Sequence, residues 1–320
     1  MKLKGFHISF LLTTAFLTFI SCAASATSEL RDFSPTAAPN PVVANSVLLC
    51  GEEINTDRED LFERFDRELT GFVYGHSSTL LMLKRANRYF PQMAPILKSH
   101  GVPDDILYLA CIESQLNPRA VSPAKAAGIW QFMSSTAQEF GLEVNDEVDE
   151  RLNIEKATEA AAKYLKSAYR KYKNWPTVMA SYNAGPTRIS RQLESQMQTN
   201  ALNLYLNDET SRYVFRVAAL KQIFENPAAY GFKLAPEQFY MPVECDIVEV
   251  SESVQSWPKW AQEHGITYSQ LRDENPWIID TKLTNKTGKT YKVRVPKKDS
   301  ISRSKNDFKI FDEKWVVNNP

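Results

Sequence analysis

Hydrophobic side chains recur at helical spacing through most of this 320-residue chain, from about residue 58 to residue 232. Residues three and four apart lie on one face of a helix, so this repeat predicts amphipathic helices packed around a shared core. The clearest stretch contains Ala157, Ala161, Tyr164, Leu165, Ala168 and Tyr172. We therefore predict an all-helical domain over residues 58–235.

Prolines and capping residues predict where individual helices end and begin. A helix that includes Phe90 is expected to stop near Pro91, because proline lacks the amide hydrogen that a helix interior needs. A second helix is expected to run from Pro91 to His100. Further along, Asn207 or Asp208 is expected to cap a helix through its side-chain oxygen.

The pattern changes at Pro242. Residues 247–250 and 291–295 are strand-like, and two short helical stretches lie between them. Over residues 242–298 we therefore predict a small α+β domain of βααβ order, and residues 299–320 are expected to form a polar tail. The fold class is mainly α, with an all-helical domain followed by this small domain.

The N-terminus has the features of a secretory signal peptide, which we predict over residues 1–26. Lys2 and Lys4 precede a mostly apolar run from about Phe6 to Ile20. This run is shorter than the roughly 20 residues of a membrane-spanning helix, although an uncleaved anchor is an alternative. We expect an exported protein, either free in the periplasm or anchored to a membrane and facing the periplasm.

Two cleavage sites compete in this segment. Residues 24–26 (Ala-Ser-Ala) form a small-x-small site that would release a soluble chain. Residues 19–22 resemble a bacterial lipobox, in which Cys22 would be lipidated and would anchor the chain in the outer membrane; Phe19 stands where leucine is usual. The sequence leaves both open. Residues 27–57, rich in Ser, Thr, Ala, Pro and Asn, are expected to form a linker.

Charge and cysteine content exclude several classes of function. Lys plus Arg and Asp plus Glu number 38 each, so no basic excess is available to bind nucleic acid. The four histidines are scattered and no Cys/His spacing predicts a metal site, so we expect neither a metal nor a cofactor. Cys111 lies in an apolar run and is expected to be buried. Cys50 and Cys245 could pair in a disulfide, which sequence alone does not establish.

Glu113 directly follows the apolar run 106–112, which predicts a buried helix. It continues the stripe of Ile106, Leu109 and Ala110 at the spacing i, i+3, i+4 and i+7. A carboxylate in this place must be paired, hydrogen-bonded or exposed in a cleft, and desolvation would raise its pKa as a general acid requires. The alternative is an ordinary carboxylate at the exposed end of a helix.

The segment after Glu113 is polar and aromatic but not acidic: the 25 residues 114–138 contain no Asp or Glu. Gly128 would let the backbone come close to a ligand, and Gln131 offers both a hydrogen-bond donor and an acceptor. Trp130 and Phe132 are expected to be core residues rather than sugar-stacking ones.

Three ordered segments together carry a resemblance to a known family: residues 113–114 (Glu-Ser), 128–133 (Gly-Ile-Trp-Gln-Phe-Met) and 182–185 (Tyr-Asn-Ala-Gly). They resemble the soluble lytic transglycosylases, which have a goose-lysozyme-like fold. Residues 148–153, 158–165 and 209–214 add a resemblance to the branch of the membrane-bound lytic murein transglycosylase D type. The resemblance runs from about residue 80 to residue 220.

The resemblance implies that the partner is the glycan strand of peptidoglycan and that Glu113 is the sole catalytic acid/base. Glu113 would protonate the oxygen of the β-1,4 bond between N-acetylmuramic acid and N-acetylglucosamine. It would then accept the proton of the muramoyl 6-hydroxyl as that oxygen attacks the anomeric carbon, so a 1,6-anhydromuramoyl end forms without water. Most glycosidases use two carboxylates. No second carboxylate lies near Glu113 in sequence, although folding could bring Glu139, Glu143 or Asp149 there.

The resemblance also implies substrate-binding positions on two segments. Ser122 and Gln131 would hydrogen-bond the sugar or the catalytic carboxylate, and Met133 would line the cleft. Tyr164 would lie near the same wall, or would be an ordinary packed residue on a helix face.

A tyrosine and an asparagine complete the implied site. Tyr182 would lie close to Glu113 and orient it, while Asn183 would hold the turn or contact substrate. Ser181 stands where the family often has alanine.

The predicted C-terminal domain resembles a LysM module, which binds N-acetylglucosamine chains. Residues 247–250, 275–277 and 291–296 match its outline. The usual Gly-Asp-Ser/Thr-Leu turn is replaced by Ser-Glu-Ser-Val at residues 251–254. Two interpretations therefore remain: the domain binds glycan, or it is a degenerate LysM fold kept for stability or spacing.

Two alternatives to a lytic transglycosylase remain at this point. A hydrolytic muramidase would use the same fold and Glu113 with water as the nucleophile, and a second acid across the cleft would favour it. A non-catalytic peptidoglycan-binding protein would require Glu113 to be idle. The sequence does not indicate the oligomeric state.

Overall fold

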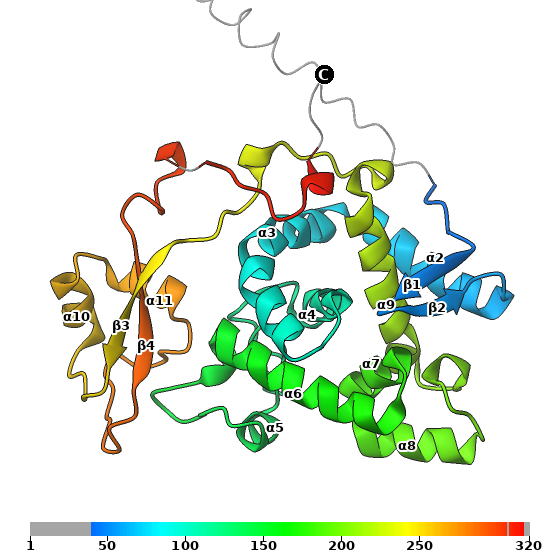
Figure 1. The fold of residues 1–320 in the computed structure, drawn as a ribbon, viewed down its shortest axis with the longest axis horizontal. Helices are drawn as coiled ribbons and strands as arrows, with labels where there is room; N and C mark the ends of the chain where they lie inside the picture. Colours follow the sequence, from blue (N-terminus) through cyan, green and yellow to red (C-terminus); the bar gives the residue numbers. More distant parts are fainter. Residues whose placement is uncertain (1–39, 306, 317–320) are drawn as a thin grey trace, which may run out of the picture. The chain divides into compact units, whose positions relative to one another are not determined.

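A computed structural model describes residues 40–305 and 307–316, and it is mainly helical with a small βααβ domain after the helical one, as predicted (Figure 1). The predicted signal peptide, Cys22 and the first part of the predicted linker lie outside the described residues. The α-helices are α2 (Glu59–Tyr74), α3 (His76–Ser99), α4 (Leu107–Ser114), α5 (Ser134–Glu139), α6 (Ile154–Tyr172), α7 (Trp175–Ala184), α8 (Pro186–Ser195), α9 (Asp208–Glu225), α10 (Trp257–Glu263) and α11 (Tyr268–Glu274).

Short 3₁₀ turns link these helices, and the strands form two separate antiparallel pairs. The turns are η1 (Asp104–Ile106), η2 (Glu150–Leu152), η3 (Ala201–Asn203), η4 (Pro227–Tyr230), η5 (Pro236–Gln238), η6 (Arg303–Lys305) and η7 (Glu313–Trp315). Strand β1 (Ser46–Leu49) pairs with β2 (Glu52–Asn55). Strand β3 (Cys245–Val250) pairs with β4 (Tyr291–Pro296), in a register that joins Cys245 to Pro296 and Val250 to Tyr291.

Helix α9 is the centre of the helical domain. It packs against α2, α4 and α7, and its buried residues include Tyr213, Phe215, Val217, Leu220 and Phe224. Asn207 occupies the N-cap position of α9, but its side chain makes no capping hydrogen bond, so the predicted cap through a side-chain oxygen is not formed. Asp208 and Glu209 stand in its first turn, where carboxylates face the positive end of the helix dipole.

The predicted break at Pro91 is wrong. Helix α3 runs unbroken from His76 to Ser99 with Pro91 and Pro95 inside it. Packing outweighs the lost hydrogen bonds here, because the residues just before Pro91 are held on two sides. Phe90 is buried, and the Asn87 side chain donates to the Tyr240 carbonyl at 3.2 Å and accepts from the Phe311 amide at 2.7 Å.

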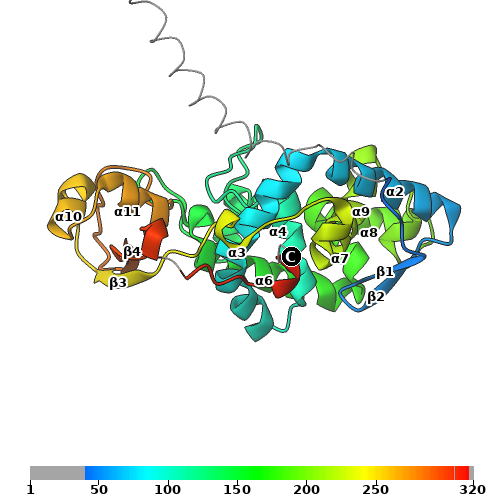
Figure 2. The ribbon, with the colours of Figure 1, turned by 90° about the horizontal axis from the view of Figure 1, so that it is seen from above.

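The predicted linker over residues 27–57 is wrong at its C-terminal end, where residues 46–55 form the β1–β2 hairpin. Val47, Leu49 and Ile54 alternate inward and are buried. Lys221 of α9 donates to the Leu48 carbonyl at 2.6 Å and pairs with Asp105, which fixes the hairpin to the helices. Figures 1 and 2 show the hairpin beside α2 and α9.

The predicted tail over residues 299–320 is also wrong in part, because its end is packed against the helical domain. Trp315 is 2% exposed, its indole N–H donates to the Phe224 carbonyl at 3.0 Å, and its ring stacks on Phe239. Leu234 forms a parallel bridge with Val316. One buried tryptophan therefore anchors a stretch whose average composition is polar.

The C-terminal domain has the predicted βααβ order, with α10 and α11 between β3 and β4 (Figure 2). Its core contains Trp257, Leu271, Trp277 and Val293 and, unexpectedly, Val148 from the helical domain, which is 1% exposed. The core of the C-terminal domain is thus completed by the segment before η2.

Several expectations about residue chemistry can be checked in the described residues. Cys111 is buried as predicted, while Cys50 and Cys245 are free, so they do not form the disulfide that the sequence left open.

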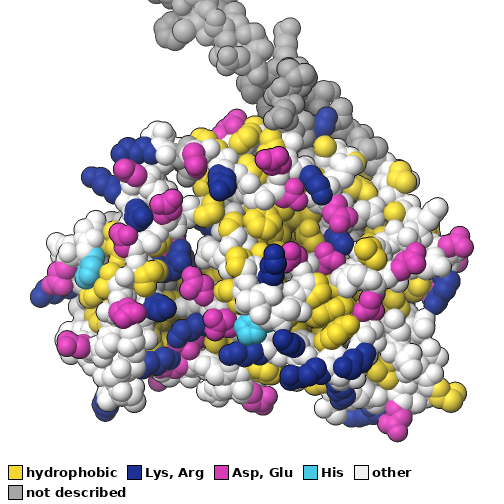
Figure 3. Space-filling model, viewed as in Figure 1, with side chains coloured by type: hydrophobic (Ala, Val, Ile, Leu, Met, Phe, Trp, Pro, Cys, Tyr) yellow, Lys and Arg dark blue, Asp and Glu magenta, His cyan; other side chains and the backbone are white. Residues whose placement is uncertain are grey.

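Charges of both signs are interspersed on the face drawn in Figure 3, with Lys and Arg gathered over α6. No helix within the described residues is long and apolar enough to cross a membrane.

Candidate active site

Glu113 lies in the last turn of α4, which is apolar on every side and buried. The helix ends abruptly, because Gln115 and Leu116 both adopt left-handed backbone conformations, with φ of +53° and +56°. Such values are uncommon for residues other than glycine and stay populated only where the surrounding structure holds them. Glu113 is therefore presented from a rigid support.

Tyr213 of α9 supplies the hydrogen bond to this carboxyl, by donating its hydroxyl to Glu113 Oε1. Tyr213 is 3% exposed, so the bond forms on the buried side of the carboxyl. Glu113 Oε2 accepts no hydrogen bond within the described residues and is not sealed from solvent. One oxygen of Glu113 is thus anchored and the other is available to a ligand.

Burial raises the pKa of Glu113 from 4.5 to about 7. The Tyr213 hydrogen bond and the positive charge of Arg216 oppose this rise, and the negative charge of Glu209 adds to it. Burial also raises the pKa of Tyr213, and the adjacent Glu113 raises it further. Near neutral pH, Glu113 can therefore both hold and release a proton, which general acid/base catalysis requires.

A groove of about 450 Å³ lies between α2, α3, α4 and α9, and Glu113 is not among its lining residues. Ile112 and Gln115 line it from α4, while Glu209 and Arg216 line it from α9. A larger cavity of about 1020 Å³ lies between the helical and C-terminal domains and does not include Glu113. We place the candidate active site at Glu113, because its carboxyl can act as an acid and as a base near neutral pH.

The segment 120–133 (the 120–133 turn) packs against the end of α4. Ser114 donates to the Ile129 carbonyl at 2.8 Å, which joins the residue after Glu113 to this turn. Gln131 donates to the carbonyls of Ala120 and Gly128, and Ser122 Oγ accepts from the Ala126 amide at 3.0 Å. Ser122 and Gln131 therefore shape the turn in this structure.

Three more residues of the turn have clear positions. Met133 is 45% exposed. Trp130 and Phe132 are buried, as predicted for core residues, and the Trp130 indole donates to Thr158 at 2.9 Å.

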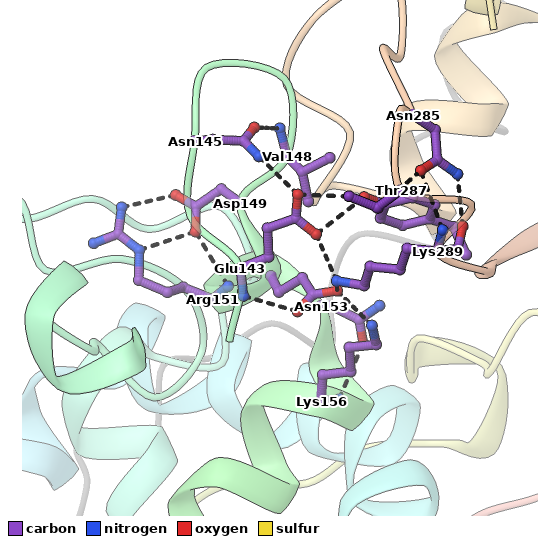
Figure 4. Close-up of polar contacts among 12 residues, drawn as sticks. Glu143, Asn145, Val148, Asp149, Arg151, Asn153, Lys156, Asn285, Thr287 and Lys289 are labelled. Carbon is purple, nitrogen blue, oxygen red and sulfur yellow. Dashed lines mark hydrogen bonds and ion pairs between the residues drawn. The ribbon is translucent and has the colours of Figure 1, made fainter. Parts of the chain in front are cut away.

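Gly128 approaches the protein's own backbone rather than a ligand. Its φ is +82°, and a Cβ added there would lie 1.9 Å from the Arg151 carbonyl oxygen. The Arg151 guanidinium donates to the carbonyls of Lys125 and Phe132. It also pairs with Asp149 at 2.7 Å (Figure 4). The turn is therefore held against residues 149–151.

Tyr182 and Tyr164 form an aromatic wall, with ring centroids 5.2 Å apart. Tyr182 donates to the Trp130 carbonyl at 2.7 Å, and its pKa is raised by burial and by the nearby charge of Glu113. Tyr182 thus lies close to Glu113, but the direct hydrogen bond comes from Tyr213. Burial raises the pKa of Tyr164 to about 12.

Asn183 connects α7 to the first turn of α9. Its side-chain oxygen accepts from Thr210 Oγ1 at 2.9 Å, and its amide lies 3.5 Å from Glu209. Asn183 therefore holds the end of α7 against α9.

The acids considered as partners for Glu113 are occupied or exposed. Glu143 bonds to Lys289 and Tyr291, Asp149 pairs with Arg151, and Glu139 is exposed at the end of α5. The described residues contain no cluster of His, Cys, Asp or Glu that could hold a metal ion.

The sequence did not single out Tyr213, Glu209 or Arg216 as site residues. Tyr213 and Glu209 belong to the segment 209–214 that carried part of the resemblance, so a signal was present. Tyr213 also continues the apolar stripe of its helix with Val217, which favoured a core assignment. Arg216 had no comparable signal.

Comparison with protein families matches residues 93–204 to the transglycosylase SLT domain. Residues 246–299 match the soluble lytic transglycosylase C-terminal LysM-like domain. The SLT match includes Glu113 and the 120–133 turn but ends before α9, which supplies Tyr213.

Curated relatives and a solved structure are similar to this chain. The membrane-bound lytic murein transglycosylase D of Escherichia coli strain K12 is 29% identical over 286 residues, which are 86% of this chain and 61% of that protein. The same protein from Escherichia coli O6:H1 gives the same values. This chain thus spans less than two thirds of the length of these relatives. The crystal structure of the 70 kDa soluble lytic transglycosylase of Escherichia coli is 24% identical, with a TM-score of 0.34, covering 43% of this chain and 24% of that chain.

Proposed function

We propose that this chain is a peptidoglycan lytic transglycosylase in which Glu113 is the catalytic acid/base. The observation that carries the proposal is the Glu113 carboxyl, inside the SLT match, with one oxygen bonded to Tyr213 and a pKa raised to about 7. The names of the relatives support the substrate class, since both are murein transglycosylases.

The reaction assigns two successive proton transfers to one carboxyl. Protonated Glu113 donates to the oxygen of the β-1,4 bond between N-acetylmuramic acid and N-acetylglucosamine, and the bond to the anomeric carbon breaks. The Glu113 carboxylate then takes the proton of the muramoyl 6-hydroxyl as that oxygen attacks the anomeric carbon. A pKa of about 7 suits both steps, because neither protonation state is strongly disfavoured.

Tyr213 and Tyr182 are proposed to position Glu113. Tyr213 holds Oε1, so that Oε2 faces the substrate, and its hydrogen bond stabilises the carboxylate that forms when the proton leaves. Tyr182 packs beside the carboxyl and fixes the 120–133 turn through the Trp130 carbonyl. Met133, exposed beside this turn, is proposed to contact the glycan.

The remaining implied substrate-binding residues keep proposed roles that fit their contacts. Ser122 and Gln131 would give the 120–133 turn the shape that the sugar meets, because their side chains bond to its backbone. Asn183 would hold the end of α7 against α9, and Tyr164 would support Tyr182 from behind.

A hydrolytic muramidase is the second candidate, because a second carboxylate, Glu209, acts on Glu113 electrostatically from α9. The variant Glu209→Gln distinguishes a hydrolytic muramidase from a lytic transglycosylase. As a base for water, Glu209 would be needed for turnover. In a lytic transglycosylase its loss would leave most activity and would lower the pKa of Glu113, because a repelling negative charge is removed.

Clearing of insoluble peptidoglycan tests whether Glu113 is catalytic. The wild-type chain is expected to solubilise the wall and Glu113→Gln to bind without clearing it. Glu139→Gln, an exposed acid of the same domain, is the matched control and is expected to clear like the wild type. Clearing by Glu113→Gln would show that Glu113 is not the acid/base.

The domain boundaries are proposed with two changes from the sequence-based ones. The catalytic unit would begin with the β1–β2 hairpin rather than at residue 58, because the hairpin packs on α9. It would also include the segment around Trp315, beyond the C-terminal domain. The C-terminal domain keeps residues 242–298.

Export is proposed from the N-terminal sequence and agrees with the membrane-bound relatives. Mass spectrometry of the mature N-terminus distinguishes the two cleavage sites. A diacylated or triacylated Cys22 would establish a lipid anchor, and a chain that begins at Thr27 would establish a soluble periplasmic protein.

A further inference from the structure

The C-terminal domain and the catalytic domain share a strand-like contact. Val148 bridges to Ile278, the Asp149 amide donates to the Trp277 carbonyl at 2.9 Å, and the Ile279 amide donates to the Glu147 carbonyl at 3.1 Å. With Val148 buried in the C-terminal core, this backbone pairing leaves the 143–150 loop little freedom.

An ionic cluster around the buried Glu150 reinforces the contact (Figure 4). Glu150 is 2% exposed and accepts from Lys156 of its own domain and, at 2.8 Å, from Lys289 of the C-terminal domain. Lys289 and Tyr291 also donate to Glu143. Burial alone would raise the pKa of Glu150, but hydrogen bonds from the Glu143 amide, Lys156 and Lys289 outweigh it and lower this pKa.

The same loop leads directly to the active-site turn. Arg151, next to Glu150, is 9% exposed. Its guanidinium donates hydrogen bonds to Asp149 and to the carbonyls of Lys125 and Phe132. The Arg151 carbonyl in turn packs against Gly128. Residues 149–151 are therefore bonded to the C-terminal domain on one side and to the 120–133 turn on the other.

The turn then contacts two residues that lie close to Glu113, namely Ser114 and Tyr182. The Ile129 carbonyl accepts from Ser114, and the Trp130 carbonyl accepts from Tyr182. A continuous chain of packed and hydrogen-bonded groups thus runs from Lys289 through Arg151 to the surroundings of Glu113.

We propose that the C-terminal domain is a positioning element of the active site: through the 143–150 loop and Arg151 it holds the 120–133 turn in place against Glu113. Lys289 and Arg151 are positioning residues, since neither contacts the reacting carboxyl. The inference rests on the proposed function for its catalytic consequence, but the contact that it describes is independent of that function.

The test uses the full chain with Lys289→Met and Lys289→Arg. Lys289→Met removes the cation from between Glu143 and Glu150, while Lys289→Arg keeps one there. Lys292→Met is the matched control, because Lys292 is an exposed lysine on β4, three residues after Lys289. Arg151→Lys is the second positioning variant, since lysine cannot reproduce the planar set of donors.

The first readout is hydrogen exchange, which does not depend on activity. Faster exchange of the amides of Ala127, Gly128 and Phe132 is expected in Lys289→Met and Arg151→Lys, but not in Lys292→Met or Lys289→Arg. These amides are hydrogen-bonded within the turn. Unchanged exchange in Lys289→Met, at a protein stability that still allows folding, would overturn the inference.

The second readout is kcat on a short soluble glycan strand, for which attachment to the wall is irrelevant. A fall of about tenfold or more is expected for Lys289→Met, since small misplacements of catalytic groups reduce rates strongly. The basic limb of its pH profile should also shift to lower pH, because a looser turn admits water to Glu113, which otherwise faces Tyr213, Tyr182, Arg216 and Glu209.

The two proposals fail in different ways. A wild-type chain that does not cleave the strand contradicts the proposed function, while the exchange data still decide the positioning role. An active wild type with an equally active Lys289→Met contradicts the positioning role alone. Loss of wall retention with unchanged kcat would assign the C-terminal domain to glycan attachment instead.

Discussion

Replacing Tyr213 by Phe removes the hydroxyl that donates to Glu113 Oε1 and keeps the buried ring. A hydrogen bond to a charged group contributes about 1.5–3 kcal/mol, and one pKa unit corresponds to about 1.4 kcal/mol. Because the bond favours the ionised carboxyl, its loss should raise the pKa of Glu113 from about 7 by about one unit.

The same substitution should slow the chemical step. The Tyr213 bond is strongest when Glu113 has given up its proton, so its loss removes stabilisation from the transition state. If about 1.4 kcal/mol is lost there, kcat/KM falls about tenfold on the acidic plateau. The deficit should shrink to about twofold at about pH 8, because a carboxyl with a higher pKa keeps more of its acid form.

The assay is kcat/KM on a soluble glycan strand over a range of pH, with Tyr205→Phe as the control. Tyr205 is 90% exposed, and its substitution should leave the profile unchanged. A deficit of Tyr213→Phe that is the same at every pH would refute the reasoning, since it would mean that the Tyr213 hydroxyl does not set the pKa of Glu113.

Three further outcomes concern stability, and equilibrium unfolding measures each. The pKa of Glu113 is about 7 in the folded chain, higher than the ordinary 4.5. Its contribution to stability is therefore present below about pH 4.5 and is lost as the pH rises through about 7. Glu113→Gln should be more stable than the wild type at pH 8, by up to roughly 3 kcal/mol, and equally stable at low pH. Gly128→Ala should destabilise severely because its Cβ would meet the Arg151 carbonyl, whereas Gly141→Ala, with φ of +87° and open space, should lose only about 1–2 kcal/mol. Trp315→Ala should cost about 3–5 kcal/mol if the C-terminal segment is part of the fold, and a loss near zero would contradict that packing.

The helical architecture and the position of Glu113 could be predicted because both follow from local periodicity. Glu113 continues an apolar stripe, and a carboxylate in such a buried stripe indicates a functional residue. The hairpin at residues 46–55 escaped notice because each strand has four residues and lies in a stretch rich in polar residues. Its signal was the alternation of Val47, Leu49 and Ile54.

The partners of Glu113 could not be predicted from spacing. Tyr213 lies 100 residues further along the chain, on a helix where its apolar neighbours favoured a core assignment. Glu143 and Asp149 were considered as second acids that folding could bring close to Glu113. In the structure Glu143 pairs with Lys289 of the C-terminal domain, and Asp149 pairs with Arg151 two residues further on.

The identity of the cleavage product tests the central claim most directly. Glycan fragments released from purified peptidoglycan by the wild-type chain and by Glu113→Gln would be compared by mass spectrometry. We expect wild-type fragments with 1,6-anhydromuramoyl ends, one water lighter than reducing ends, and none of them with Glu113→Gln. Reducing ends released by the wild type would contradict a lytic transglycosylase and would mean that water is the nucleophile.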